Sequence, residues 1–291
     1  MTAHAHHQAE NKLDIGQLIK WTVYILLLFN WGFYFWEEWV ISGHTLRQGG
    51  TFLEWTEAFA TSIDELGWFG LLLAFELETY VLDDDAFDRP KVKWSVYGLR
   101  MVCYLLIAHT ILARTTTVMD VEVVTLSNEY TNVCQLVGKD MSWGDNFYYD
   151  EITQENCAGF TEDERLYFIE PMVITDHQGL QTELKMTWLD LFEAITWLLI
   201  MFTLEVAVWL QNREITGGTL MLLSHLGKLL YGFLFFAAGY WVYRTHWVYA
   251  WDELLWIVGF WAIERNLSEW RDEIREDQDT DPDPEGAVAP G

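Results

Sequence analysis

The chain has 291 residues, of which 51% are hydrophobic and 16% are Phe, Trp or Tyr, and its formal net charge is −27 at pH 7. A surface this acidic argues against binding to nucleic acid, because phosphate backbones attract basic proteins. The hydrophobic residues gather in runs close to the length of a transmembrane helix. The composition therefore predicts an integral membrane protein.

Six apolar runs predict six transmembrane helices. The first run does not resemble a cleaved signal peptide, because it is too long and lacks a small-residue cleavage site. We therefore expect an all-α, multi-pass integral membrane protein. The predicted helices cover residues 16–40, 63–82, 94–114, 188–211, 219–243 and 252–270.

The order of these runs divides the chain into five parts. Residues 16–114 hold the first three helices and residues 188–270 hold the last three. The flanking parts are an N-terminal segment, 1–15, and an acidic tail, 271–291, which we expect to be disordered. Lysine and arginine are denser in the short segments on the side of the membrane that carries the N-terminus. Both termini should therefore be cytoplasmic. This predicts a protein of the cell (inner) membrane with residues 115–187 as an extracytoplasmic cap.

The predicted cap contains two of the three cysteines, Cys134 and Cys157. An oxidising compartment favours a disulfide between them. Two stretches of the cap, VEVVTL (121–126) and RLYFIEPMVIT (165–175), are rich in β-branched and aromatic residues and predict strands that pair. We therefore expect a small, ordered, disulfide-bonded cap between helices three and four.

Helices two, four and six share one spacing: an acid, a Trp four residues later, and a Glu eight residues after the Trp. The acid and the Trp lie on the same face of a helix at this spacing. One copy in each helical hairpin predicts three parallel-repeat hairpins around a pseudo-threefold axis. The copies are Asp64–Trp68–Glu76, Glu193–Trp197–Glu205 and Asp252–Trp256–Glu264.

The glutamates of the repeat predict a belt of charge inside the membrane. Twelve residues of helix separate each glutamate from its outer acid by about 18 Å, which places it within a hydrocarbon core about 30 Å thick. Bases near the cytoplasmic ends of the odd helices are the expected partners. The predicted pairs are Lys20 with Glu76, Arg100 with Glu205 and Lys228 with Glu264. Glu78 is an additional acid that the other repeats lack.

Three functions remain open at this point. Intramembrane carboxylates bind cations or relay protons, so the charge belt together with the outer acids Asp64, Glu193 and Asp252 predicts an ion channel or a proton-coupled transporter. The same ion pairs also fit a non-catalytic scaffold or an accessory subunit of a membrane complex, because they can fix helix packing alone. In a third interpretation, His109 and His246 ligate a haem in an electron-transfer subunit.

The sequence favours neither an enzyme nor a resident cofactor. It contains no G-x-x-x-x-G-K-[ST], G-x-S-x-G or H-E-x-x-H motif. Aromatic residues crowd two stretches, WGFYFWEEW (31–39) and GYWVYRTHWVYAWDE (239–253), at predicted outer ends of helices. These stretches predict an interfacial belt against the lipid bilayer. A surface for a membrane-protein partner, or for self-association, is the alternative.

Overall fold

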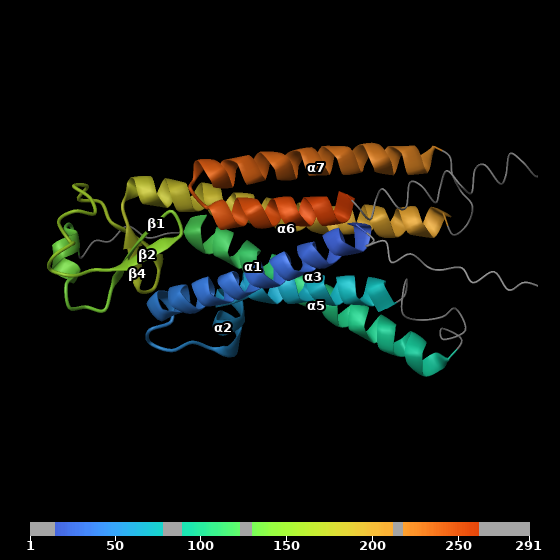
Figure 1. Ribbon diagram of the computed structural model, residues 1–291. Coiled ribbons are helices and arrows are strands. Elements are labelled where there is room, and N and C mark those ends of the chain that lie inside the picture. The colour runs from blue at the N-terminus through green and yellow to red at the C-terminus, as the bar shows by residue number, and fades with distance from the viewer. Residues whose placement is uncertain (1–14, 78–88, 123–129, 212–217, 262–291) are drawn as a thin grey trace, which may run out of the picture.

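In the computed structural model, residues 15–77, 89–122, 130–211 and 218–261 are described. Helices pack side by side along one long axis, and a small sheet lies at one end of them (Figure 1). The expectation of a mainly helical chain with a small, disulfide-bonded cap is confirmed. The labelled helices are α1 (Ile15–Thr45), α2 (Phe52–Ala58), α3 (Ala60–Glu76), α5 (Pro90–Glu122), α6 (His177–Gln211) and α7 (Thr219–Tyr243). A further helical segment covers residues 247–261.

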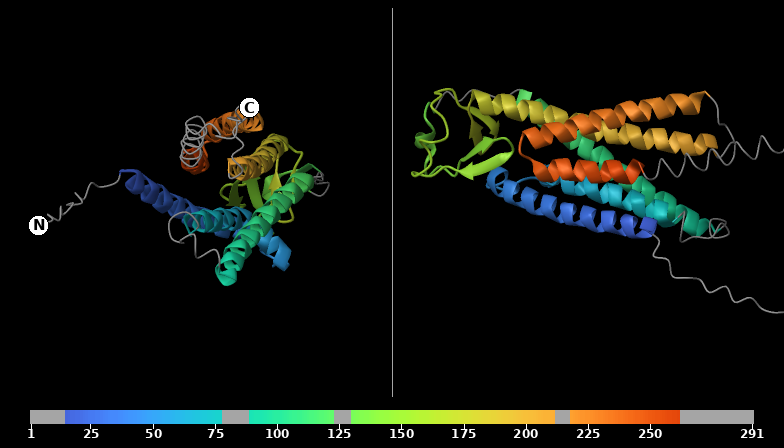
Figure 2. Two further views of the ribbon diagram at one scale, coloured as in Figure 1. Left: turned by 90° about the vertical axis from the view of Figure 1, so that its right-hand side faces the viewer. Right: turned by 45° about the horizontal axis from the view of Figure 1, so that its top comes forward.

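Successive long helices alternate in direction. The helices α1, α5 and α7 run toward the sheet, whereas α3, α6 and the segment 247–261 run away from it (Figures 1 and 2). Two helices extend beyond their apolar runs, because α5 continues past residue 114 to Glu122 and α6 begins at His177, before residue 188. These extensions carry the bundle up to the sheet, where α6 contacts strands of the cap.

The number of membrane spans differs from the sequence-based expectation. Among the described residues, the stretch Pro90–Val121 of α5 is long and apolar enough to cross a membrane. The pair α2 and α3, bent by 74° at Phe59, meets the same requirement when its two helices are taken together. Six spans are therefore not confirmed by length and composition. Within α6, the acids Asp190, Glu193 and Glu205 lie in the predicted span.

The tightest helix packing joins α3 to α5. Cys103 of α5 is buried and free of disulfide bonds, and it packs against Gly70 of α3. A Cβ added at Gly67 would lie 2.9 Å from Cγ1 of Ile107, which is closer than side-chain contacts allow. Small residues at these positions permit the close approach of the two helices.

The centre of the bundle is an aromatic cluster made by the three repeat tryptophans and Phe260. The ring centroid of Trp68 lies 6.4 Å from that of Trp197 and 6.2 Å from that of Trp256. Phe260 contacts all three indoles at centroid distances of 5.2 to 6.1 Å. Thus equivalent positions of α3, α6 and the segment 247–261 meet at one point of the core.

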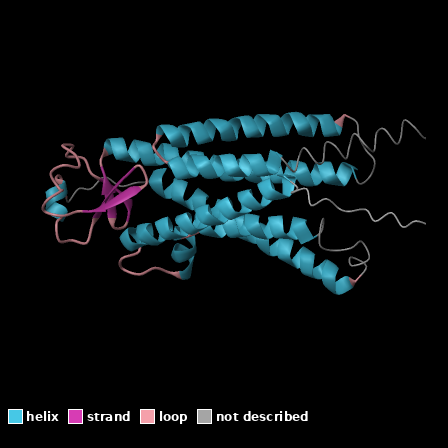
Figure 3. Cartoon of the chain, in the orientation of Figure 1, coloured by secondary structure: helices cyan, strands magenta, loops and turns pink. Residues whose placement is uncertain are grey.

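The cap is a four-stranded sheet with the order β2-β1-β4-β3 (Figure 3). Its strands β1 and β4 pair in parallel, and the other two pairings are antiparallel. The strands are β1 (Ser142–Asp145), β2 (Tyr148–Glu151), β3 (Tyr167–Glu170) and β4 (Val173–Thr175).

The strand predictions for the cap were partly wrong. The stretch 165–175 folds back on itself as the β3–β4 hairpin. Val121 and Glu122, the first residues of the other stretch, end α5, and its remaining residues lie outside the described part of the chain. The central strand β1 was missed, because SWGD is short and lacks β-branched residues. The predicted disulfide between Cys134 and Cys157 is present.

The turn between β1 and β2 attaches the cap to the bundle. Asn146 and Phe147 both have positive φ angles, 55° and 61°, as a type I′ turn requires. The Phe147 amide donates a hydrogen bond to Glu183 of α6 at 2.9 Å. Nε of Arg244 donates to Oδ1 of Asn146 at 2.7 Å, and Nε2 of His246 lies 3.0 Å from the Asn146 carbonyl oxygen. A backbone conformation that is unfavourable for Phe is thus held by bonds from two helical elements.

Lowering the pH from 7 to 5 should stabilise this attachment. Burial raises the pKa of Glu183 to about 7, with Asp145 and Glu170 adding to the shift and Arg244 opposing it. The folded protein therefore binds more protons than the unfolded chain between pH 4.5 and 7, so the stabilisation is complete below pH 4.5 and is lost as the pH rises toward 7. The expected effect is on the order of 1–3 kcal/mol.

Thermal unfolding of the detergent-solubilised protein across this pH range measures the effect. Glu183→Gln should flatten the profile relative to the wild type, whereas Glu155→Gln, an exposed cap residue, should leave its slope unchanged. Equal slopes in the wild type and Glu183→Gln would contradict the assignment.

Candidate functional site

A cavity of about 490 Å³ lies where the helices meet the cap. Its walls come from α1, α2, α3, α5, α6, Trp241 of α7 and the segment 247–261, with Phe147, Tyr149 and Glu170 among the residues contributed by the cap. Twelve carboxylates and one basic side chain, Arg114, line it. The carboxylates are those of Glu37, Glu38, Glu54, Glu57, Asp64, Glu65, Asp120, Glu170, Asp190, Glu193, Asp252 and Glu253.

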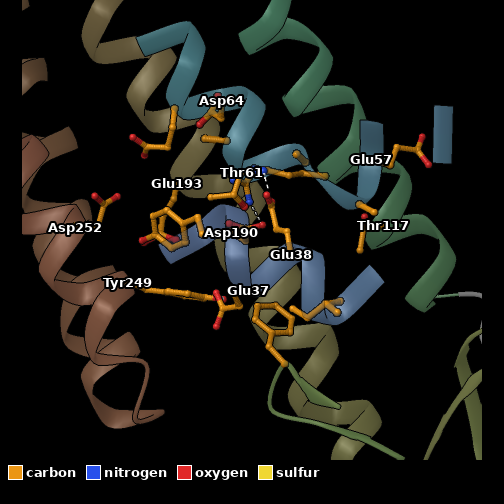
Figure 4. Close-up of a pocket in the computed structure, with 18 of the residues that line it drawn as sticks. Glu37, Glu38, Glu57, Thr61, Asp64, Thr117, Asp190, Glu193, Tyr249 and Asp252 are labelled. Carbon is orange, nitrogen blue, oxygen red and sulfur yellow. Dashed lines mark hydrogen bonds and ion pairs between the residues drawn. The ribbon is translucent and has the colours of Figure 1, made fainter. Parts of the chain in front are cut away.

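The first acid of each repeat faces this one cavity. Asp64, Glu193 and Asp252 come from three helices and surround the same space, with Glu37 of α1 opposite them (Figure 4). The repeat places a Trp one helical turn below each of these acids, so the aromatic cluster forms the floor of the cavity. Glu193 lies well inside α6, which begins at His177.

Neutral hydrogen-bond donors hold most of the buried carboxylates. Three indole N–H groups each donate to one carboxylate, and the Tyr249 hydroxyl donates to Glu37 at 2.7 Å. The Asn30 amide donates to Asp252 at 2.8 Å. The indole donations are from Trp241 to Glu193 at 2.8 and 2.9 Å, from Trp197 to Glu253 at 3.1 Å, and from Trp256 to Glu65 at 3.2 Å.

Glu38 of α1 is bound in a different way, to the start of α3. Its carboxylate accepts the backbone N–H of Thr61 at 2.7 Å and that of Ser62 at 3.1 Å, as well as the Ser62 hydroxyl. These are amides of the first helical turn, which lack intrahelical acceptors. Glu38 therefore caps α3 and fixes α1 against it.

Positive charge is scarce in the cavity wall. Arg114 of α5 forms an ion pair with Asp190 of α6, and among the described residues no other lysine or arginine lines the cavity. Two carboxylate oxygens in the wall, Oε2 of Glu65 and Oε1 of Glu253, have no hydrogen-bond donor. These two side chains belong to residues that are only 5% and 9% exposed. The wall therefore combines many acidic side chains with a single described basic one, and two of its carboxyl oxygen atoms lack a donor.

The charge belt appears in part below the aromatic cluster. Arg100 and Glu205 form the predicted pair, with Nη1 and Oε1 3.6 Å apart. Glu205 also accepts the hydroxyl of Tyr104 at 2.9 Å, and Glu76 accepts that of Tyr24 at 2.8 Å. Sequence reasoning missed these tyrosines, although they stand four residues after Arg100 and after Lys20.

The remaining belt residues are not brought together by the described structure. Lys228 is exposed on α7. The Lys20 side chain, Glu78 and Glu264 lie outside the described residues, so the pairs that involve them stay predictions.

The two histidines proposed for haem occupy different surroundings. The His246 ring stacks on Tyr148 and Tyr249, at centroid distances of 5.1 and 4.9 Å, and binds the cap turn. His109 lies within α5 and is half-buried. None of the ring contacts described for His246 involves His109. The haem interpretation stays an untested prediction.

Several cavity residues carried a signal that the sequence analysis did not use. The motif Asp-Glu-Leu-x-Trp occurs at 64–68 and again at 252–256, so Glu65 and Glu253 are equivalent positions of two repeats. Glu37 and Glu38 were read as part of an aromatic belt. Searches against protein-family models, curated proteins and solved structures find no match to this chain.

Proposed function

We propose that this chain is a multi-pass membrane protein that binds a cation in the acidic cavity as part of a transport cycle. The apolar outer surface of the bundle supports the membrane location. Only 28% of the spanning window of α5 is buried inside the protein, which is far less than in the core helix of a soluble protein. Large apolar side chains are also exposed along α1, α6 and α7, among them Phe29, Phe202 and Leu229.

The orientation follows from the disulfide and from the distribution of basic residues. The bond between Cys134 and Cys157 suits an oxidising compartment, so we place the cap outside the cytoplasm and both termini inside. The cavity then lies on the extracytoplasmic side of the bundle, and the Arg100–Glu205 pair lies toward the cytoplasm.

The charge balance of the cavity carries the functional proposal. Indole, phenol and amide groups hydrogen-bond the carboxylates without cancelling their charge, and Arg114 is already paired with Asp190. Carboxylates clustered away from bulk water are costly unless they take up protons or cations. Cation binding, with exchange of protons, satisfies this wall better than any occupant of neutral or negative charge.

The packing below the cavity favours a transporter over an open channel. Along α3 and α6, the order is acid, Trp and then glutamate, so the Trp68–Trp197–Trp256 cluster separates the cavity from the belt. A path between them requires this cluster to rearrange, as in alternating access. The same packed cluster is what favours the second candidate, a non-catalytic scaffold or accessory subunit of a membrane complex.

Cation-dependent thermal stability tests the proposal. We expect at least one of Na⁺, K⁺, Mg²⁺, Ca²⁺, protons or tetramethylammonium to stabilise the purified protein at constant ionic strength, by about 2.7 kcal/mol at one hundred times its dissociation constant. Glu253→Gln should weaken that effect, because it removes a carboxylate from the cavity wall. Glu155→Gln, on the exposed cap surface, is the matched control.

Flux measurements in proteoliposomes complete the test. A gradient of the stabilising cation should drive its uptake by the wild type and less by Glu253→Gln. If no cation stabilises the wild type and none moves across the membrane, the transport proposal fails, and the scaffold interpretation replaces it.

A further inference from the structure

We infer that the occupant of the cavity is an organic ammonium ion, held by the faces of aromatic rings and by buried carboxylates. This inference rests on the proposed function, because it names the class of cation that the same cavity takes. Three features of the wall carry it: its size, its rings and an unpartnered oxygen atom.

The size of the cavity suits a small organic molecule better than a bare metal ion. Small-molecule sites have volumes of about 300–1,000 Å³, and this cavity has about 490 Å³. Calcium requires six to eight oxygen atoms within about 2.6 Å, whereas separate indole, phenol and amide donors already bind several of the cavity carboxyl groups. In the described part of the chain, no three His, Cys, Asp or Glu side chains are arranged as metal ligands.

Aromatic rings line the part of the wall between α1 and the segment 247–261. The ring centroid of Tyr249 lies 5.6 Å from that of Tyr34 and 5.3 Å from that of Trp241. The rings of Tyr249 and Trp241 pack edge to face, at an interplanar angle of 76°, and both residues line the cavity. Aromatic ring faces attract substituted ammonium groups, which bind in aromatic cages.

The polar groups at the edges of these rings donate hydrogen bonds to carboxyl groups. The Trp241 N–H donates to Glu193 and the Tyr249 hydroxyl donates to Glu37. Each ring therefore has an anion at its edge. One face of Tyr249 stacks on His246, with ring centroids 4.9 Å apart, so only the opposite face is left for a ligand. A cation beside these rings gains attraction both from the ring faces and from the nearby carboxylates, which a neutral ligand of the same shape does not.

An unpartnered oxygen atom provides an independent indication of a ligand. Oε1 of Glu253 lacks a donor, although this residue is more than nine-tenths buried and lines the cavity. Glu65, by contrast, shares a side-chain hydrogen bond with the carboxyl group of Asp252. Buried acceptors are normally satisfied. The N–H groups of an ammonium ion, or the polarised methyl groups of a quaternary one, would satisfy Oε1 of Glu253 without requiring metal geometry.

The test compares choline with its uncharged isostere, 3,3-dimethylbutan-1-ol, by calorimetric titration of the full-length protein in detergent. NaCl and CaCl₂ at matched ionic strength are the inorganic probes. We expect choline to bind at least about tenfold more tightly than the isostere, because only the charge differs. Equal binding of the two, or no binding of choline, would overturn the inference.

Two variants of Tyr249 distinguish the contribution of its ring to choline binding from that of its hydroxyl group. Tyr249→Leu should weaken choline binding at least about fivefold, because it removes a ring face, whereas Tyr249→Phe should retain most of the affinity. Circular dichroism and size-exclusion chromatography establish that both variants fold. Glu155→Gln serves as the surface control.

The outcomes distinguish this inference from the proposed function. Suppose that Na⁺ or Ca²⁺ binds, that this binding is lost in Glu253→Gln, and that neither Tyr249→Leu nor choline affects it. The cavity then takes an inorganic cation, and only the present inference fails. If no probe binds at all, both the inference and the proposed function fail.

Discussion

Trp68→Ala should lower the free energy of unfolding by about 3–5 kcal/mol, the range for removing a large aromatic side chain from a packed core. Trp68 is 6% exposed, and its ring contacts Trp197, Trp256 and Phe260. It therefore joins α3 to α6 and to the segment 247–261 at one point. Alanine would leave a cavity that helices fixed by the rest of the bundle cannot close.

Chemical or thermal unfolding in detergent micelles measures this loss, with Trp94→Ala as the matched control. Trp94 lies on α5 and is 73% exposed, so its removal opens no cavity and should change stability by less than about 1 kcal/mol. Equal losses in the two variants would show that Trp68 does not hold the repeats together.

Arg114→Met should destabilise the protein by about 1–3 kcal/mol, because it removes the partner of the Asp190 carboxylate, whose side chain is 32% exposed. The Arg114 side chain is 12% exposed, and methionine retains much of its apolar volume. In the part of the chain that the structure describes, no other lysine or arginine lines this cavity to replace the lost charge. The effect should therefore exceed that of a surface ion pair.

A double substitution identifies the cause. Arg114→Met combined with Asp190→Asn should recover most of the lost stability, because the stranded charge is removed. Arg165→Met breaks an exposed pair with Asp163 and should cost no more than about 1 kcal/mol. If the double variant is no more stable than Arg114→Met alone, the loss arises from packing rather than from charge.

The features that could be predicted from the residues alone depend on patterns among residues close together in the chain. Apolar runs of helical length predicted a mainly helical chain, and the two cysteines of one segment predicted their disulfide. The acid-Trp-Glu spacing identified Trp68, Trp197 and Trp256 as equivalent residues. These inferences succeed because helix periodicity and cysteine pairing within one segment are encoded in neighbouring residues.

Which of these residues contact one another could be learned only from the folded structure. The repeat indicated three equivalent acids, but only the folded bundle places Asp64, Glu193 and Asp252 around one cavity with Glu37 of α1. The bend at Phe59 and the place of β1 at the centre of the cap sheet also depend on contacts distant in sequence.

Hydrogen-bond partners were the hardest feature to infer. The sequence did not indicate that the Tyr24 hydroxyl donates to Glu76, as it does in the structure. Likewise, Glu193 is bound by Trp241, which lies 48 residues away in the chain. Spacing along a helix defines the face on which a side chain lies, but the rotation and register of neighbouring helices decide which donor reaches it.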